Sequence, residues 1–403
     1  MTTLYQRSKT GKTKILHLWT SGPFLYTKWG LIGSKLQESS KECTPKNTGK
    51  TNETTAEQQA VEELKHKVNK KTKEGYTKNI NESNERSISD ISLDNLPVYF
   101  CPSKPKKECP KKIIGKTYGQ IKRNGHCIPL VKTESGKVKK YSRRMKEITE
   151  YVKYVPEFED ITSKMENGTL VMTEFCVTGK DGIDRPRLSS EITRKEDADK
   201  VKKARENILK NNKIEVIPFD IMFYRNKFVG NIDYMERYKI LQGLKLPNIP
   251  EIYKDWQKYV GQHKEQGKEG WILRIQGEDS HISYSLSGKE DRCGCWKYVY
   301  TRNDDFIVTS ASKGLAGKHT GLYCKFDISQ YVDGTLTSCG KCGPGKLNHK
   351  RLAELTREID SGETKFPFVI MIEYRTRQPD TLKLEFPQLV RVRYDKNPEE
   401  CTI

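Results

Sequence analysis

The stretch GQIKRNGHC, residues 119–127, places a lysine between a strand-like run and a turn, and the residues downstream decide how this lysine is interpreted. The four residues Lys-Arg-Asn-Gly are uninformative alone, because a chain with 73 Lys and Arg residues contains such patterns by chance. Whether Lys122 is a nucleophile depends on further features, which occur downstream in a fixed order. They are YSRR (141–144), TEF (173–175), PFDI (218–221), EGWILR (269–274), CWKYV (295–299) and FPQLVRVRYDKNPEECT (386–402).

Composition bounds the class of protein. A length of 403 residues suits two or three domains, and the net charge of +20 favours a polyanionic partner, nucleic acid before a membrane. The N-terminus lacks the apolar run of a signal peptide, and no window is apolar enough to span a membrane. We therefore expect a soluble intracellular protein, cytoplasmic or nuclear, in which the 11 cysteines stay reduced or ligate metal. The lysine- and asparagine-rich composition also suits a viral or phage protein acting in its host.

Periodicity and composition shifts divide the chain into four segments. Residues 1–78 alternate as short strands and then carry a helical apolar spacing that ends near Gly75, with a polar loop expected at 39–54. Residues 79–95 are polar, without a sustained period, and predict a linker. Residues 96–302 alternate strand-like and helix-like runs, which indicates a mixed α+β domain. Residues 303–403 are rich in short strands and contain one amphipathic helix, at 348–362, with Asn348 as its N-cap.

The ordered features resemble those of the covalent nucleotidyltransferases, specifically the ATP-dependent DNA ligases, over residues 96–403. The closing RYDKNPEECT is the most discriminating part, because it matches the family's final Arg-x-Asp-Lys with a trailing Pro-Glu. The resemblance implies an α+β multidomain protein with an adenylation domain at 96–302 and an OB-fold barrel at 303–403. It also implies that AMP passes from Lys122 to the 5′-phosphate of a nick, and that the 3′-hydroxyl then displaces AMP, as in DNA repair, replication and recombination.

The family's functional residues carry over position by position. A lysine that attacks the α-phosphate of ATP must be neutral, so nearby cations such as Arg123, Arg143 and Lys297 would lower its pKa. Magnesium, or manganese in its place, would offset the triphosphate charge beside Glu269. The resemblance implies that Glu174 binds the ribose, Phe219 stacks on adenine and Gln120 contacts the base. It gives catalytic roles to Lys297, Arg393 and Lys396, and nucleotide contacts to Arg143, Arg274 and Asp395.

The N-terminal segment is similar, more loosely, to the WGR domain of DNA-repair proteins. TKWGLIG (27–33) carries the likeness, although Leu31 replaces the namesake arginine. The resemblance implies that Trp29 meets DNA near a break, whereas the alternative makes it a core residue. The basic run at 104–112 adds a surface that either tracks phosphates or is simply solvated, through Lys104, Lys106 and Lys107.

Several departures keep alternatives open. Asn124 and Cys127 stand where the family has an aspartate and an arginine, and Val299 lies after Lys297 where a second lysine is usual. An RNA ligase of the same superfamily and a non-catalytic DNA-end-binding protein are therefore the rival interpretations. Nicked double-stranded DNA is the expected partner, bound by a monomer. Zinc is not expected, although four cysteines could supply thiolates: Cys293, Cys295, Cys339 and Cys342.

Overall fold

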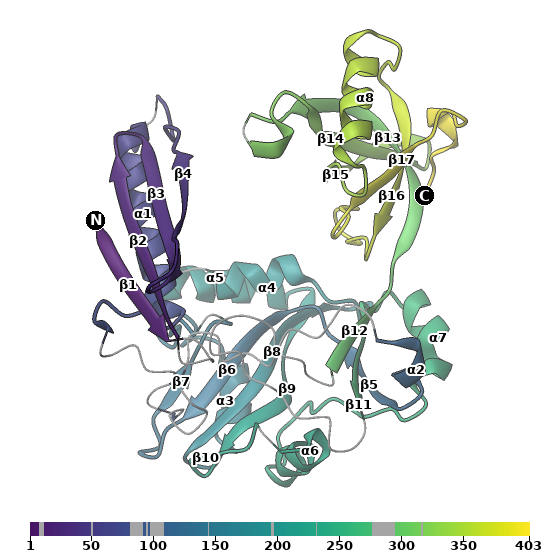
Figure 1. The fold of residues 1–403 in the computed structure, drawn as a ribbon. Helices are drawn as coiled ribbons and strands as arrows, with labels where there is room; N and C mark the ends of the chain where they lie inside the picture. The colour runs from purple at the N-terminus through teal and green to yellow at the C-terminus, as the bar shows by residue number, and fades with distance from the viewer. Residues whose placement is uncertain are drawn as a thin grey trace.

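The computed structural model covers 403 residues and is shown in Figure 1. The predicted DNA contacts Lys104, Lys106 and Lys107, the cysteine Cys293 and most of the predicted linker 79–95 lie outside the described residues. Those described are 1–7, 12–49, 51–80, 92–93, 96, 109–143, 145–194, 197–230, 232–275, 295–315 and 317–403.

The N-terminal part is an antiparallel sheet covered by one helix. Strands β1 (Thr2–Arg7), β2 (Thr13–Ser21), β3 (Phe24–Leu31) and β4 (Gln37–Glu42) pair in chain order, and helix α1 (Ala56–Lys73) packs on the sheet. Thr55 and Gln58 form a capping box at the start of α1, which fixes where the helix begins. The prediction of a loop from residue 39 was wrong, because β4 extends to Glu42. All its side chains are exposed, so hydrophobic patterning cannot reveal a strand that is held by backbone pairing to β3.

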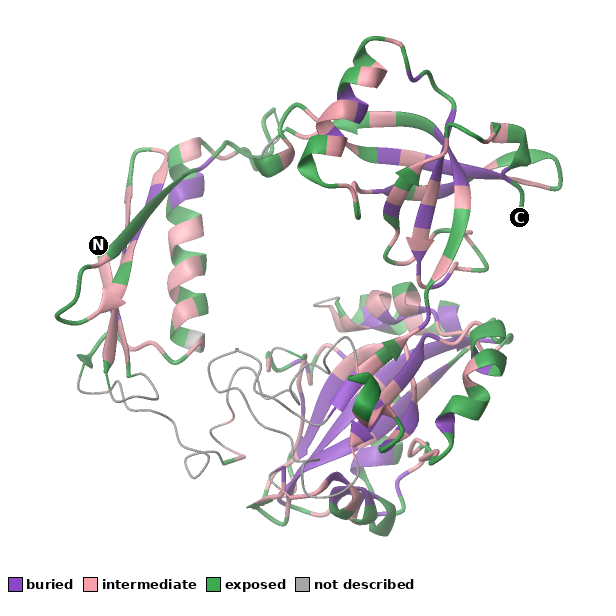
Figure 2. Ribbon diagram, turned by 45° about the vertical axis from the view of Figure 1, so that its right-hand side comes forward, coloured by how far each residue is buried: buried purple, intermediate pink, exposed green. Residues whose placement is uncertain are grey.

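The central part contains two sheets. The larger has the order β10-β9-β8-β6-β7, and the smaller has the order β12-β11-β5, antiparallel throughout. Figure 2 shows that buried residues concentrate on the strands of the larger sheet. The strands are β5 (Thr117–Lys122), β6 (His126–Lys132), β7 (Val138–Lys140), β8 (Thr169–Gly179), β9 (Asn212–Tyr224), β10 (Lys227–Phe228), β11 (Gly270–Ile275) and β12 (Cys295–Val299).

Helices of the central part cover these sheets. Phe158, Phe175 and Leu241 are fully buried in the larger sheet's core, and Trp256 and Trp271 are buried behind the smaller sheet. Within 96–302, the sequence has strand-like runs at 169–177 and 214–223 and helix-like runs at 195–211 and 253–267. The two strand-like runs are β8 and β9, and the run at 195–211 is α5. The run at 253–267 instead divides into a 3₁₀ turn and α7. The helical elements are α2 (Lys111–Ile114), η3 (Pro156–Phe158), α3 (Glu159–Thr162), α4 (Pro186–Thr193), α5 (Ala198–Leu209), α6 (Tyr234–Gly243), η4 (Trp256–Tyr259) and α7 (Val260–Glu265).

The C-terminal part is a curved five-stranded sheet with the order β15-β14-β13-β16-β17. A bridge between Gly343 and Gln388 joins its two edges, which makes the sheet barrel-like. Asn348 caps α8 as predicted, by accepting a hydrogen bond from Arg351 N at 2.8 Å. Cys339 and Cys342 are buried in the apolar core of this sheet. Its elements are β13 (Arg302–Lys313), η6 (Gly317–His319), β14 (Tyr323–Val332), β15 (Thr335–Cys342), α8 (His349–Asp360), β16 (Phe368–Tyr374), β17 (Gln388–Val392) and η7 (Pro398–Glu400).

The predicted mixed α+β, sheet-rich class is confirmed. The N-terminal and C-terminal parts each have one sheet, the central part has two, and each part has its own buried apolar cluster. Within the described segments, no helix is both long and apolar enough to cross a membrane.

Candidate active site

Lys122 lies where the two central sheets meet. It is the last residue of β5 in the smaller sheet, and residues 123–125 lead directly into β6 of the larger one. We call residues 122–125 the nucleophile loop. The loop passes so close to β8 that a Cβ on Gly125 would lie 2.2 Å from the carbonyl oxygen of Phe175. Glycine is therefore required at this position on steric grounds.

The smaller sheet presents one face to Lys122. Side chains two residues apart share a face of a strand, so Gln120 and Lys122 project together from β5. The backbone of Ile272 pairs with both Gln120 and Lys297, which aligns Lys297 with the same face. Gly270 stands opposite Lys122, and a Cβ on it would meet the carbonyl oxygen of Tyr298 at 2.1 Å.

The lysine forms an ion pair with Glu269. Lys122 Nζ contacts Glu269 Oε2, and it also donates to the Arg123 carbonyl oxygen at 3.3 Å. Arg375 Nη1 of the C-terminal part reaches the other carboxylate oxygen, Oε1, at 3.1 Å. The Glu269 side chain is only 3% exposed, so a buried carboxylate is shared between two cations. Magnesium prefers carboxylate oxygen, so Glu269 is a suitable ligand type for the predicted metal.

Burial and charge shift two groups beside this pair. Burial, together with the charges of Lys122 and Arg143, lowers the pKa of Lys297, and Glu269 opposes that change. Burial raises the pKa of Glu174 to about 7, which Glu269 reinforces and which Lys122 and the hydrogen bond from Gly125 N oppose. Perturbed groups gathered around one lysine are typical of functional sites.

A second polar cluster lies next to Gln120. The Gln120 carbonyl accepts from Tyr234 OH at 2.8 Å and from Arg274 Nε at 3.4 Å, while its amide donates to Pro250 O at 3.3 Å. The Arg274 guanidinium lies 3.7 Å from the Tyr234 ring centroid. Gln120 and Arg274, both predicted nucleotide contacts, are thus brought together and held by protein partners.

Beneath this cluster lies a fully buried ion pair. Arg237 Nε and Nη2 contact the two oxygens of Asp220 at 2.8 and 3.2 Å, and both side chains are 0% exposed. Arg274 Nη1 approaches the same carboxylate at 3.4 Å. Asp220 therefore links the core to the predicted base contacts, next to the half-buried Phe219.

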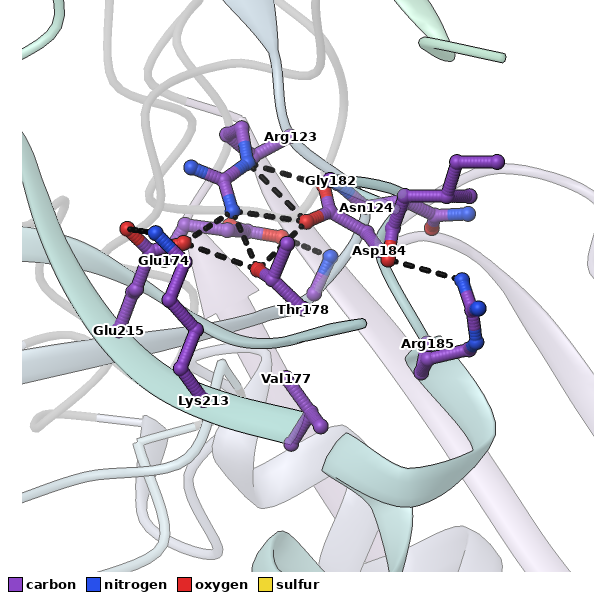
Figure 3. Close-up of polar contacts among 12 residues, drawn as sticks. Arg123, Asn124, Glu174, Val177, Thr178, Gly182, Asp184, Arg185, Lys213 and Glu215 are labelled. Carbon is purple, nitrogen blue, oxygen red and sulfur yellow. Dashed lines mark hydrogen bonds and ion pairs between the residues drawn. The ribbon is translucent and has the colours of Figure 1, made fainter. Parts of the chain in front are cut away.

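The structure does not support the expectation that Arg123 acts as a free cation beside Lys122. Its guanidinium is neutralised by Asp184 and Glu215, and it also donates to Thr178 (Figure 3). Two carboxylates surround one arginine, so no excess positive charge remains for Lys122.

The C-terminal part meets the nucleophile loop through the segment between β16 and β17, not through its closing motif. Asn124 Nδ2 donates to Glu385 Oε2 at 2.7 Å, so the asparagine that replaces the family's aspartate has a partner in this segment. Arg185 Nε contacts Asp380 Oδ1 at 2.9 Å in the same region.

The closing motif forms a cluster of its own around Asp305. Arg393 Nη1 lies 2.9 Å and Lys396 Nζ lies 3.0 Å from Asp305 Oδ2, and Asp395 accepts two further hydrogen bonds from Arg393. The predicted contacts of these three residues with the triphosphate stay predictions.

The remaining predicted residues occupy varied positions. Arg143 lies exposed in a turn after β7, and its charge acts on Glu174 and Lys297. Cys127 pairs across the sheet with Glu174 and is partly buried. Trp29 is 37% exposed on β3, so the alternative that it is a core residue was wrong, and its DNA contact stays a prediction.

Sequence reasoning missed residues that support the site. The pair of Asp220 and Arg237 could have been anticipated, because an aspartate within an apolar strand needs a cationic partner when it is buried. No sequence pattern pointed to three other residues, because turns and the approach of segments distant in the sequence bring them to the site. They are Asp184, Arg375 and Glu385.

Comparison with known proteins finds a family model that matches the central part of the chain. Residues 102–272 match the family model described as ATP dependent DNA ligase domain, which includes Lys122, Glu174, Phe219 and Glu269. This part of the chain is thus similar to a domain of the ATP-dependent DNA ligases.

Similar curated proteins include DNA ligases of archaea. A DNA ligase of Methanococcus aeolicus is 27% identical over 285 residues, covering 65% of this chain and 49% of the relative. A DNA ligase of Methanocaldococcus jannaschii is 25% identical over 333 residues, covering 71% of this chain and 55% of the relative. The chain thus spans about half the length of the curated relatives it matches.

Solved structures of ligases are similar at lower identity. A Lig E DNA ligase is 15% identical, with a TM-score of 0.48 and coverage of 72% of this chain and 98% of that one. A chlorella virus DNA ligase-adenylate is 14% identical, with a TM-score of 0.33 and coverage of 73% and 100%.

Proposed function

We propose that this protein is an ATP-dependent DNA ligase that seals nicks through a covalent lysine–AMP intermediate on Lys122. The observation that carries the proposal is the ion pair between Lys122 and the buried Glu269 at the junction of the two sheets. It lies within a segment that matches the ATP-dependent DNA ligase domain. A lysine held in this way, beside groups with perturbed pKa values, suits nucleophilic catalysis.

The first step forms a bond between Lys122 Nζ and the α-phosphorus of ATP and breaks the bond to the pyrophosphate oxygen. The lysine must lose a proton for this attack, and the carboxylate of Glu269 is in contact with Nζ to accept it. Lys297 faces the same side of the sheet, where its charge would offset negative charge that develops on the phosphate.

The nucleotide contacts are assigned from the polar clusters. Glu174 would bind the ribose, and Phe219 would stack on the adenine beside Gln120 and Arg274. Arg143, Arg393, Asp395 and Lys396 would contact the phosphates. A magnesium ion held by Glu269 would supply charge neutralisation for the triphosphate.

The later steps concern DNA. AMP would pass to the 5′-phosphate at a nick, and attack by the 3′-hydroxyl would release AMP and join the strands. We propose that residues 303–403 form an OB-fold that binds the nicked duplex. The strand order β15-β14-β13-β16-β17, the bridge between its edges and the placement of α8 between β15 and β16 support this. The four-stranded sheet with α1 would serve as a WGR-like DNA contact through Trp29.

A labelling experiment tests the proposal. The full chain is incubated with magnesium and either α-labelled ATP or α-labelled GTP, and the protein is then examined for covalent label. We expect label from ATP that pyrophosphate removes, and none for Lys122→Ala. Label that persists in Lys122→Ala, or none in the wild type, would refute the mechanism. The labelled protein is then given nicked DNA and nicked RNA, and sealing of RNA alone would make the protein an RNA ligase.

A further inference from the structure

Arg123 is anchored more firmly than a surface arginine. Its Nε lies 3.0 and 3.1 Å from the two oxygens of Asp184, and its Nη2 lies 2.7 Å from one of them. The same Nη2 lies 2.8 Å from Glu215 Oε2 and 2.7 Å from Thr178 Oγ1 (Figure 3). The side chains of Arg123, Asp184 and Glu215 are 22%, 12% and 16% exposed. A forked contact with two partly buried carboxylates fixes geometry in a way that exposed pairs do not.

Asp184 also holds the backbone of the nucleophile loop. Its Oδ2 accepts a hydrogen bond from Asn124 N at 2.9 Å, while Glu174 Oε1 accepts one from Gly125 N at 3.1 Å. Asp184 therefore fixes the two residues directly after Lys122, because it accepts hydrogen bonds from the Arg123 side chain and from the Asn124 backbone. The preceding residues are fixed by the ladder between β5 and β11.

Backbone hydrogen bonds hold the turn that carries Asp184. Thr178 and Asp184 pair as a bridge, and Gly179 N donates to Ile183 O at 2.9 Å. Gly182 has a φ of +74°, a conformation that favours glycine. Asp184 is thus placed from β8 of the larger sheet, independently of β5.

We propose that Asp184 and Arg123 are positioning residues that hold Lys122 in line with the α-phosphate, with Glu215 and Thr178 as their support. This inference rests on the proposed function. Neither residue touches the reacting atoms, and they act through the backbone of the nucleophile loop. Displacing a nucleophile by about 1 Å lowers a rate by about a hundredfold, so loss of this anchor slows the attack even when ATP binds normally.

The experiment measures single-turnover formation of labelled protein from α-labelled ATP and magnesium. The variants Asp184→Asn and Arg123→Met each remove one partner of the ion pair, the first in the turn after β8 and the second in the nucleophile loop. The matched control is the pair Arg205 and Glu157, which has a similar forked contact, at 2.7 and 3.3 Å, and side chains 21% and 19% exposed. Its variants are Arg205→Met and Glu157→Gln. Thermal unfolding of every variant shows whether the two pairs lose comparable stability.

We expect the Asp184 and Arg123 variants to form label about tenfold to a hundredfold more slowly at saturating ATP, with unchanged half-saturating ATP. The control variants should label at the wild-type rate. The double variant should be no slower than the slower single variant, because both changes remove one contact. The deficit should persist from about pH 6.5 to about pH 9, since positioning does not depend on the charge of the lysine.

Three results would overturn the inference. Wild-type rates in both Asp184→Asn and Arg123→Met would do so, as would a deficit that disappears at high pH, or an equal deficit in the control variants. If Asp184→Asn does not fold, Arg123→Met decides. An absence of label in the wild type would instead refute the proposed function, and this inference with it.

Discussion

Glu174 and Glu215 lie on adjacent strands, β8 and β9, and their pKa values shift in opposite directions. Burial raises the pKa of Glu174 from an ordinary 4.5 to about 7. Burial also opposes ionisation of Glu215, but hydrogen bonding and charge from Arg123 outweigh it and lower that pKa to about 2. The two carboxyls therefore predict opposite dependences of stability on pH, which the variants Glu174→Gln and Glu215→Gln separate.

The sign is set by proton uptake. Between pH 4.5 and about 7, folded Glu174 keeps a proton that the unfolded chain has lost, so stability falls as pH rises. At about 1.4 kcal/mol for each pH unit, the full change in the free energy of unfolding is about 3 kcal/mol. Glutamine cannot ionise but can still accept the hydrogen bond from Gly125. Glu174→Gln should therefore gain up to about 3 kcal/mol relative to the wild type as pH rises from about 5 to about 8.

Glu215→Gln should behave differently over the same range. Glu215 stabilises the fold above pH 4.5, and this contribution is lost only as pH falls toward about 2. Its glutamine variant should therefore be destabilised by up to about 3 kcal/mol, at a constant difference from the wild type between about pH 5 and about pH 8.

The assay is thermal unfolding of the full chain across this pH range, after pyrophosphate treatment so that Lys122 carries no nucleotide. A change of about 3 kcal/mol corresponds to about 6–12 °C for a domain of this size. A difference between Glu174→Gln and wild type that does not change with pH would show that Glu174 is ionised throughout, and the reasoning from burial would be wrong.

Three further predictions concern other contacts. Arg237→Met should lower the free energy of unfolding by about 3–5 kcal/mol, measured by urea titration, because it leaves Asp220 buried without its main partner. Asn124→Asp would bring a second carboxylate against Glu385, a repulsion of about 1–4 kcal/mol, and small-angle X-ray scattering should show a larger radius of gyration that Glu385→Gln reverses. An unchanged radius would refute that contact. Gly125→Ala should reduce covalent labelling by about a hundredfold while circular dichroism stays native, and normal labelling would contradict the close approach to β8.

The sequence predicted those parts of the fold in which apolar residues repeat. Helix α1, helix α8 with its cap Asn348, and the buried strands β8 and β9 were all predicted from periodicity. Strand β4 was not, because it buries no side chain and its partner is the backbone of β3. Periodicity reports burial, not hydrogen bonding, so an exposed edge strand resembles a loop.

The residues of the candidate site were predicted from the order of motifs along the chain. That order does not give the distances between their side chains. Lys122 and Glu269 were both predicted, and the structure brings them into contact across the smaller sheet. The pairing of Arg123 was not predicted, because its partners, Asp184 and Glu215, come from separate turns and strands. A charge in a sequence is visible, but its neutralisation depends on tertiary contacts that no local pattern records.

The crossing of the nucleophile loop between sheets has a mechanical consequence. Lys122 belongs to the smaller sheet, whereas Glu174 stands on the larger one, and only residues 123–125 separate β5 from β6. A hinge motion of one sheet against the other would therefore alter the separation of Lys122 from Glu174. Because three residues connect the two strands, the position of Lys122 Nζ depends on the angle between the two sheets as well as on the rotamer of the lysine side chain.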